Sequence, residues 1–310
     1  MRGKRPTPEP EEVKLQGKGP EIKNYRIAPR TVEKLEKIGI KALFPVQQAT
    51  FDLVYDGKDI MGRDITGSGK TLAYALPLIE RFRQQKVIEP GKKRTERSPL
   101  IVVVVPTREL VIQVSSVFEQ IKHEDEYKVI SVYGGSPMEP QVDGLRRGAE
   151  VVVGTTGRLM DHLERGTLQI GKSQCIVLDE ADRMLDMGFQ EDVEKIFEYV
   201  RGTASNGKTS AGGPAPPAKS SSPQCLLFSA TFPSWVRQVS GKYLDPAFTL
   251  VDLVKNLTNK TASSVRHFAV FCPYANRTSI LADISKASFI NFISIMLWGY
   301  FWENDCLHAD

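Results

Sequence analysis

Cysteine is scarce in this chain of 310 residues, and its four cysteines are widely separated. No two of them form a Cys-x-x-Cys pair, so the sequence disfavours a structural zinc site. The low count also disfavours a disulfide-stapled secreted domain, and free thiols are typical of a reducing, intracellular compartment. With 41% apolar residues, the chain is long enough to bury one large core or two smaller ones.

Long hydrophobic runs are also missing. The most apolar stretch, residues 289–302, is shorter than the roughly 20 residues that a membrane-spanning helix needs. The first residues are polar and rich in proline, and they have no apolar core of a secretory signal. The net charge of +4 is small, so composition alone neither requires nor excludes a nucleic-acid partner.

One glycine-rich segment carries a candidate phosphate site just before a helix-like stretch at residues 72–81. The segment consists of Thr66, Gly67, Ser68, Gly69, Lys70 and Thr71. Its glycines let backbone N–H groups converge on phosphate oxygens, and the helix N-terminus adds positive potential. Lys70 is expected to reach the β- and γ-phosphates, and the Thr71 hydroxyl to help hold Mg²⁺.

An acidic segment follows a candidate buried strand at residues 175–178. It consists of Asp179, Glu180, Ala181 and Asp182. Open parallel sheets bind ligands at the carboxyl ends of their strands, where this segment would lie. Asp179 is expected to hold Mg²⁺, partly through water, and Glu180 to polarise an attacking water. Together, the two segments predict a nucleoside triphosphatase.

The four letters Asp-Glu-Ala-Asp make the chain resemble the DEAD-box RNA helicases, and further segments match motifs of that family in the family's order. These are the glutamine motif at residues 39–47, RNA-contact motifs at residues 106–110, 134–135 and 155–159, and the Ser-Ala-Thr motif at residues 229–231. The many matches, in one order, make the resemblance specific. It extends over most of the chain.

The resemblance implies a role for each matched residue. Gln47 would recognise the edge of adenine, and Asp182 would contact Ser229 and Thr231, whose motif couples ATP hydrolysis to strand separation. As an alternative or an additional role, Asp182 would cap the helix that follows it. The expected RNA contacts are Pro106, Thr107, Arg108, Gly134, Gly135, Thr155, Gly157 and Arg158.

Such RNA contacts would be made mostly to phosphates, so binding is expected to tolerate many sequences and to weaken with salt. For Arg158, an ion pair with an internal acid is the alternative to an RNA contact.

Three positions depart from the family's pattern. Asp64 stands where a small residue is usual, and its carboxylate would repel a triphosphate, which predicts weakened nucleotide affinity. The aromatic residue expected to stack on adenine falls at Ile22, with Tyr25 nearby, so these two are the candidates for contact with the base. Thr156 replaces a usual proline.

Short apolar runs alternate with helix-length segments and predict an α/β fold. The runs are residues 100–105, 129–132, 151–153, 175–178 and 225–228, with 248–253 as one more candidate strand. This alternation predicts a parallel sheet with helices on both faces. The resemblance implies the RecA-like form of that fold.

Composition divides the chain into segments. Residues 1–20 are expected to be a disordered arm, 21–254 the ATP-binding domain with a flexible insertion at 202–224, and 255–284 a linker. The family's second RecA-like domain is expected after the linker. Residues 285–310 are instead a short apolar tail, which we interpret as foreign sequence replacing that domain. A helix that binds a membrane or a partner is the alternative.

The resemblance implies an ATP-dependent RNA helicase that uses ATP and Mg²⁺, binds the RNA backbone and acts as a monomer away from membranes. Without the second domain's arginines, the chain is expected to bind ATP and RNA weakly and not to unwind duplexes. Two alternatives stay open: a non-catalytic RNA- or partner-binding isoform, and a DNA helicase. The form of the glutamine motif favours the nucleus or nucleolus, with a plant-type organelle as the alternative.

Overall fold

The computed structural model describes residues 11–12, 19–65, 67–91, 98–202 and 222–254, together with 276, 279–280 and 283. The chain divides into two units, residues 1–262 and 263–310. Of the second unit, the structure describes only four residues, and there the Ser279 hydroxyl donates a hydrogen bond to the carbonyl of Asn276 at 3.0 Å. Thr66, residues 203–221 of the expected insertion, the expected linker at 255–284 except for those four residues, and the expected tail at 285–310 lie outside the described residues.

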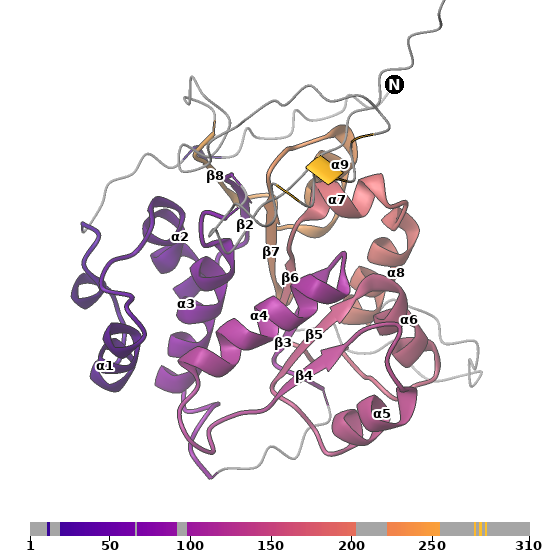
Figure 1. The fold of residues 1–310 in the computed structure, drawn as a ribbon, viewed down its shortest axis with the longest axis horizontal. Coiled ribbons are helices and arrows are strands. Elements are labelled where there is room, and N and C mark those ends of the chain that lie inside the picture. Colours follow the sequence, from indigo (N-terminus) through magenta and orange to yellow (C-terminus); the bar gives the residue numbers. More distant parts are fainter. Residues whose placement is uncertain are drawn as a thin grey trace, which may run out of the picture. The chain divides into compact units, whose positions relative to one another are not determined.

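The first unit contains one parallel sheet, drawn as arrows in Figure 1. Its strands are β1 (Glu11–Glu12), β2 (Ile60–Arg63), β3 (Ile101–Val105), β4 (Val129–Val132), β5 (Val151–Thr155), β6 (Cys175–Leu178), β7 (Gln224–Ser229) and β8 (Thr249–Asp252). Their order across the sheet is β1-β8-β2-β7-β6-β3-β5-β4, and each of these neighbouring pairs is parallel. The expectation of a parallel sheet is therefore confirmed.

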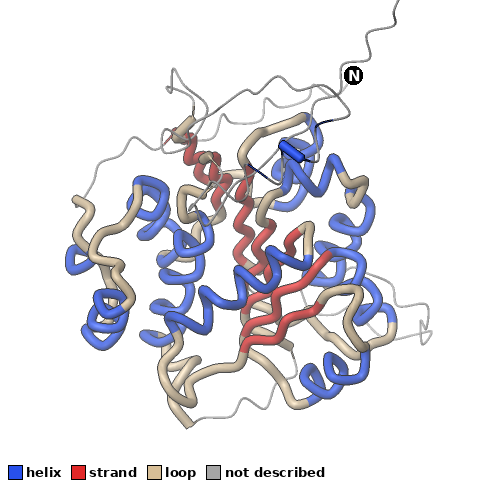
Figure 2. Tube along the Cα trace, in the orientation of Figure 1, coloured by secondary structure: helices blue, strands red, loops and turns tan. Residues whose placement is uncertain are grey.

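Helices cover both faces of the sheet, as Figure 2 shows in blue on either side of the red strands. They are η1 (Ile22–Asn24), α1 (Pro29–Lys37), α2 (Pro45–Tyr55), α3 (Lys70–Gln84), α4 (Arg108–Ile121), α5 (Met138–Arg146), α6 (Thr156–Glu164), α7 (Ala181–Asp186), α8 (Gln190–Arg201) and α9 (Ser234–Tyr243). Among the helices that the structure describes, none has the length and apolar character that crossing a membrane would require.

Two hydrophobic clusters explain why the strands are apolar at successive positions. Along β3, Ile101, Val103 and Val105 point into the cluster formed with α1 to α4, whereas Val102 and Val104 point into the cluster formed with α5 to α9. A strand whose side chains alternate between two buried faces must be apolar on both, which is the pattern of a covered parallel sheet.

The structure corrects the sequence-based boundaries at two places. Glu11 and Glu12 pair with Thr249 and Leu250 of β8, so the expectation of a disordered arm is wrong for these two residues, whose backbone extends the sheet. Gln224 was expected to end the insertion, but it is the first residue of β7 and is buried. Its side-chain amide donates hydrogen bonds to backbone carbonyls of the α2 region, which fixes the start of the strand.

Strand β2 was not expected from the sequence at all. It is only four residues long and includes Gly62 and Arg63, so its apolar signal is weak. In the structure, β2 lies between β8 and β7. The placement matters because β2 leads directly into the candidate phosphate loop.

Candidate functional site

All the motifs singled out from the sequence lie at one edge of the sheet. Because the strands are parallel, their carboxyl ends meet at the same edge, which is where such sheets bind ligands. The candidate phosphate loop follows β2, the acidic segment follows β6, and the Ser-Ala-Thr segment begins at the end of β7; these three strands are neighbours. The expected RNA contacts follow β3, β4 and β5, which are also neighbours, so the two groups occupy adjoining parts of the edge.

The phosphate loop has a backbone that only glycine adopts readily. Gly67 and Gly69 have φ values of +81° and +85°, in the left-handed region. A Cβ atom added to Gly69 would also lie 2.4 Å from Nε2 of Gln47, which is too close for any side chain. Conformation therefore favours glycine at both positions, and at Gly69 a side chain would also displace the amide of Gln47.

Lys70, the first residue of α3, is turned back into the loop. Its Nζ donates hydrogen bonds to the backbone oxygens of Asp64 and Ile65 at 3.0 and 2.8 Å. The Ser68 hydroxyl nearby is buried and has no hydrogen-bond partner in the structure. An ammonium group held by carbonyl dipoles and an unpaired hydroxyl are groups that phosphate oxygens satisfy well, so this loop fits a triphosphate.

Asp179 is buried at the end of β6, with 5% of its surface exposed. One carboxylate oxygen accepts a hydrogen bond from the Tyr74 hydroxyl at 3.0 Å, and the other accepts one from the backbone N–H of Glu180 at 3.0 Å. Burial raises the pKa of Asp179 to about 6, although the positive charge of Lys70 opposes the rise. The loop lysine and this acid therefore share one electrostatic environment, and a hard oxygen ligand at this place fits Mg²⁺.

Glu180 has an unusual backbone conformation for a residue with a side chain. Its φ is +55°, and it directly precedes α7. Left-handed conformations of non-glycine residues cost free energy and are concentrated at functional sites. Its carboxylate accepts a hydrogen bond from Nη1 of Arg183 at 2.7 Å, across one turn of the helix.

Asp182 joins the acidic segment to the Ser-Ala-Thr segment. One of its carboxylate oxygens accepts hydrogen bonds from both the backbone N–H and the hydroxyl of Thr231, each at 2.9 Å. Its backbone N–H donates to the hydroxyl of Ser229 at 3.1 Å. The expected contact is therefore confirmed. The expected helix cap is wrong, because α7 begins at Ala181 with Glu180 as its N-cap residue, so Asp182 lies inside the helix, and its other oxygen accepts the backbone N–H of the next residue, Arg183.

Gln47 lies in the first turn of α2 and is buried against the phosphate loop. Its Oε1 accepts a hydrogen bond from the backbone N–H of Phe44 at 2.9 Å, and its Nε2 donates one to the carbonyl of Gly69 at 3.0 Å. A primary amide has two donors and two acceptor positions, so one of each stays available for a ligand. Recognition of adenine by Gln47 stays a prediction.

The two residues expected to contact the adenine ring are instead part of the core. Ile22 is 1% exposed and Tyr25 is 7% exposed. The Tyr25 ring packs on Phe51 with 5.1 Å between centroids, and its hydroxyl donates to the carbonyl of Gly19. Both side chains belong to the hydrophobic core around α1 to α4, and their contact with adenine stays a prediction. The segment before α1 is used for packing.

The expected RNA contacts begin at the loops after β3 and β4. The Thr107 hydroxyl caps α4 by accepting a hydrogen bond from the backbone N–H of Leu110 at 3.4 Å. The guanidinium of Arg108 lies over the ring of Tyr133, 5.0 Å from its centroid. Gly135 after β4 faces the same guanidinium, because a Cβ added there would lie 3.9 Å from Nη1 of Arg108. The segment at residues 106–110, which includes Pro106, and the segment at residues 134–135, which includes Gly134, therefore meet at Arg108.

Arg158, in the third expected RNA-contact segment, is engaged within the protein. Its Nη1 donates to the carbonyl of Ser136 at 3.2 Å, and its Nε lies 3.5 Å from the carboxylate of Asp161. The structure thus gives Arg158 an acid partner on the same helix, although the side chain of Asp161 is 53% exposed, and an RNA contact by Arg158 stays a prediction. Thr155 precedes α6 and Gly157 lies in its first turn, where a Cβ would meet no atom within 4 Å, so space for a ligand backbone exists there.

The geometry is that of a parallel α/β domain with a glycine-rich phosphate loop and a buried acid on neighbouring strands. Residues 44–239 match the family model described as DEAD/DEAH box helicase. The chain belongs to this family.

Named relatives and a solved structure agree with this assignment. The chain is 40% identical over 262 residues to "ATP-dependent RNA helicase DDX50" of Mus musculus, with 84% of this chain and 33% of the relative covered. It is 38% identical over 277 residues to "Nucleolar RNA helicase 2" of Rattus norvegicus, with 89% and 33% covered. The chain thus spans about a third of the length of these curated relatives.

The fold is similar to the crystal structure of a DEAD box protein from the hyperthermophile Methanococcus jannaschii. The TM-score is 0.62 at 29% sequence identity, and the match covers 75% of this chain and 56% of that chain. The RecA-like form of the α/β fold expected from the resemblance is therefore confirmed.

Proposed function

We propose that this domain binds ATP with Mg²⁺ and the backbone of RNA, and that it is the ATP-binding part of an RNA-dependent ATPase and helicase. The observation that carries the proposal is the convergence of Lys70 and Asp179 at one sheet edge, where the charge of Lys70 acts on the pKa of Asp179. Two relatives bear names that include "RNA helicase", which supports the choice of RNA as the partner.

Residues of the phosphate loop and Asp179, which follows β6, bind different parts of the nucleotide. The backbone N–H groups around Gly67 and Gly69 and the ammonium of Lys70 bind phosphate oxygens, in place of the loop carbonyls that Lys70 contacts now. Thr71 and Asp179 would hold Mg²⁺, and the ion would supply positive charge that neutralises the phosphates.

Glu180 and Asp182 serve the steps that follow binding. Glu180 orients a water molecule toward the terminal phosphate. Asp182 holds Thr231 by two hydrogen bonds at 2.9 Å, so a shift of the acidic segment on nucleotide turnover pulls directly on the Ser-Ala-Thr segment. This is a physical connection between nucleotide state and the residues proposed to couple hydrolysis to RNA.

RNA binds across the loops after β3, β4 and β5. Arg108 provides positive charge, and Gly135 and Gly157 leave the backbone accessible to phosphates. Such contacts tolerate many sequences and weaken as salt rises. The expectation of a nucleolar location is supported by the name of one relative, "Nucleolar RNA helicase 2".

Fluorescent-nucleotide titration tests the proposal. Lys70→Ala should weaken Mg²⁺-ATP binding by at least about tenfold, since it removes a charge-assisted contact to phosphate. Lys195→Ala is the matched control, because Lys195 lies on the exposed side of α8 in a long pair with Asp192 at 3.9 Å. Equal affinity of wild type and Lys70→Ala, or no binding of ATP by the wild type, would contradict the proposal.

A further inference from the structure

Phe44 is an exposed aromatic residue beside the candidate site. It is 56% exposed, and it is the one aromatic among the large exposed apolar residues of the described part of the chain, with Ile38, Ile112 and Met187. Single exposed apolar residues are common on protein surfaces and need no explanation. The position of Phe44 relative to the phosphate loop is what distinguishes it.

Phe44, Gln47 and Gly69 form one continuous contact. The backbone N–H of Phe44 donates to Oε1 of Gln47, and Nε2 of the same amide donates to the carbonyl of Gly69. The Phe44 ring is close to the loop as well, because its Cδ2 lies 3.0 Å from the place of a Cβ on Gly69. The exposed ring therefore stands next to the amide proposed to recognise the base and to the loop proposed to bind the phosphates.

A base that is recognised along its edge by Gln47 still has two apolar faces to shield from water. Ile22 and Tyr25 pack into the hydrophobic core, where the Tyr25 ring lies against Phe51. An aromatic ring is a good partner for any base, because every base has a π-face. Among the described side chains, Phe44 combines the aromatic ring, the exposure and the proximity to Gln47 that this role requires.

We propose that Phe44 supplies the surface on which the adenine ring rests, while Gln47 contacts the edge of the ring. This inference rests on the proposed function, since it assumes that ATP binds at the phosphate loop. The two residues then have different roles. Phe44 increases the affinity for any purine nucleotide, whereas Gln47 discriminates adenine from guanine. This inference also moves the base-contacting role from the segment before α1 to the residue that precedes α2.

Calorimetric titration with ATP and with inorganic tripolyphosphate tests the assignment, because only ATP carries a base. Phe44→Ala should weaken ATP binding by about 5- to 100-fold, the range for loss of one base–aromatic contact. Affinity for tripolyphosphate should not change, and GTP should weaken by the same factor as ATP. Phe44→Tyr should keep the wild-type affinity. Ile112→Ala is the matched control, with a similarly exposed apolar residue on α4.

A second measurement uses Phe44→Trp, whose fluorescence should change on addition of ATP and not on addition of tripolyphosphate. Equal weakening of ATP and tripolyphosphate by Phe44→Ala would overturn the inference, because it would show that the ring only supports the loop. Unchanged ATP affinity would also overturn it. If Lys70→Ala abolishes ATP binding and Phe44→Ala does not weaken it, only this inference fails; if neither matters, the proposed function fails first.

Discussion

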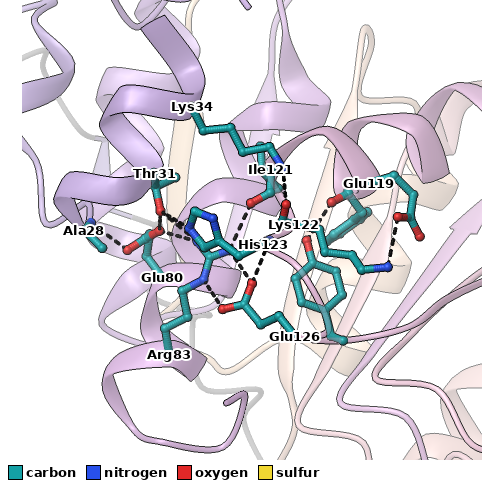
Figure 3. Close-up of polar contacts among 12 residues, drawn as sticks. Ala28, Thr31, Lys34, Glu80, Arg83, Glu119, Ile121, Lys122, His123 and Glu126 are labelled. Atoms are coloured by element: carbon teal, nitrogen blue, oxygen red, sulfur yellow. Dashed lines mark hydrogen bonds and ion pairs between the residues drawn. The ribbon is translucent and has the colours of Figure 1, made fainter. Parts of the chain in front are cut away.

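Replacing Arg83 with methionine is expected to destabilise the domain strongly, because Arg83 lies between two buried carboxylates (Figure 3). Its guanidinium is 2.5 Å from the carboxylate of Glu80 and contacts that of Glu126 with two nitrogens, each at 2.6 Å. The exposed fraction of both glutamate side chains is only 4%. The same group also donates to the hydroxyl of Thr31, and so joins α1, α3 and the loop after α4.

The magnitude follows from what the substitution leaves behind. Methionine keeps an apolar stem of similar length, but it leaves Glu80 and Glu126 buried near each other without a cation. Removing one partner of a buried ion pair costs about 3–5 kcal/mol, because the remaining charge is uncompensated. Replacing Glu80 and Glu126 by glutamine in the same chain should restore most of the loss, since no buried charge then remains.

The loss should depend on pH. Burial by itself would raise the pKa of Glu126, but the hydrogen bonds and charge of Arg83 outweigh it and hold this pKa below its usual value of 4.5. In the wild type, this ion pair stabilises the fold above pH 4.5, and its contribution is lost as pH falls through the lower native pKa. Without Arg83, burial raises the pKa of Glu126, so the deficit of Arg83→Met should shrink as pH falls from 7.5 toward 5.

Urea unfolding followed by circular dichroism measures both effects. Lys195→Met is the control: its pair with Asp192 has the same helical spacing as Arg83 and Glu80 but is exposed, so the loss should stay below about 1 kcal/mol. A loss below about 1 kcal/mol for Arg83→Met, or a deficit that grows at lower pH, would refute the reasoning.

Three further substitutions test the nucleotide site. Since burial raises the pKa of Asp179 to about 6, protonation should weaken the Mg²⁺-dependent part of ADP binding below that pH; Asp179→Asn should remove the pH step, and a wild-type profile without a step would contradict this. Asp64→Ala should strengthen ATP binding about fivefold by removing the carboxylate of a residue that is only 7% exposed beside the phosphate loop, and unchanged affinity in calorimetry would exclude this repulsion. Asp182→Ala removes both acceptor contacts to Thr231, so RNA stimulation of ATP turnover in the whole protein should fall while ATP affinity stays the same; retained stimulation would disprove the coupling.

Much of the fold was predictable because buried parallel strands carry a strong local signal. Val102 to Val105 must be apolar on both faces, so their sequence shows a strand without any knowledge of its neighbours. The signal of Gly67 and Gly69 is equally local, because a left-handed backbone conformation favours glycine whatever the distant contacts are. The phosphate loop, the acidic segment and their order were therefore visible in the chain.

Other features depend on contacts between distant residues and had no local signal. Strand β2 is short, and its pairing with β7 and β8 supplies the hydrogen bonds that make it a strand. In the sequence, Tyr74 reads as an ordinary apolar residue of α3. Only the fold shows that its hydroxyl contacts Asp179, which lies 105 residues further along the chain. Likewise, two of the partners of Arg83, Thr31 and Glu126, come from other elements.

The amino-acid sequence by itself determined the parallel α/β architecture, the phosphate loop and the acidic segment, since glycine conformation and apolar alternation act over a few residues. Only the tertiary structure decided which of two aromatic residues stays exposed. Tyr25 and Phe44 are both large and apolar, but Tyr25 packs on Phe51 whereas Phe44 stays 56% exposed beside Gln47. The different exposure of these two rings follows from the packed fold, because it depends on which distant residues cover each ring.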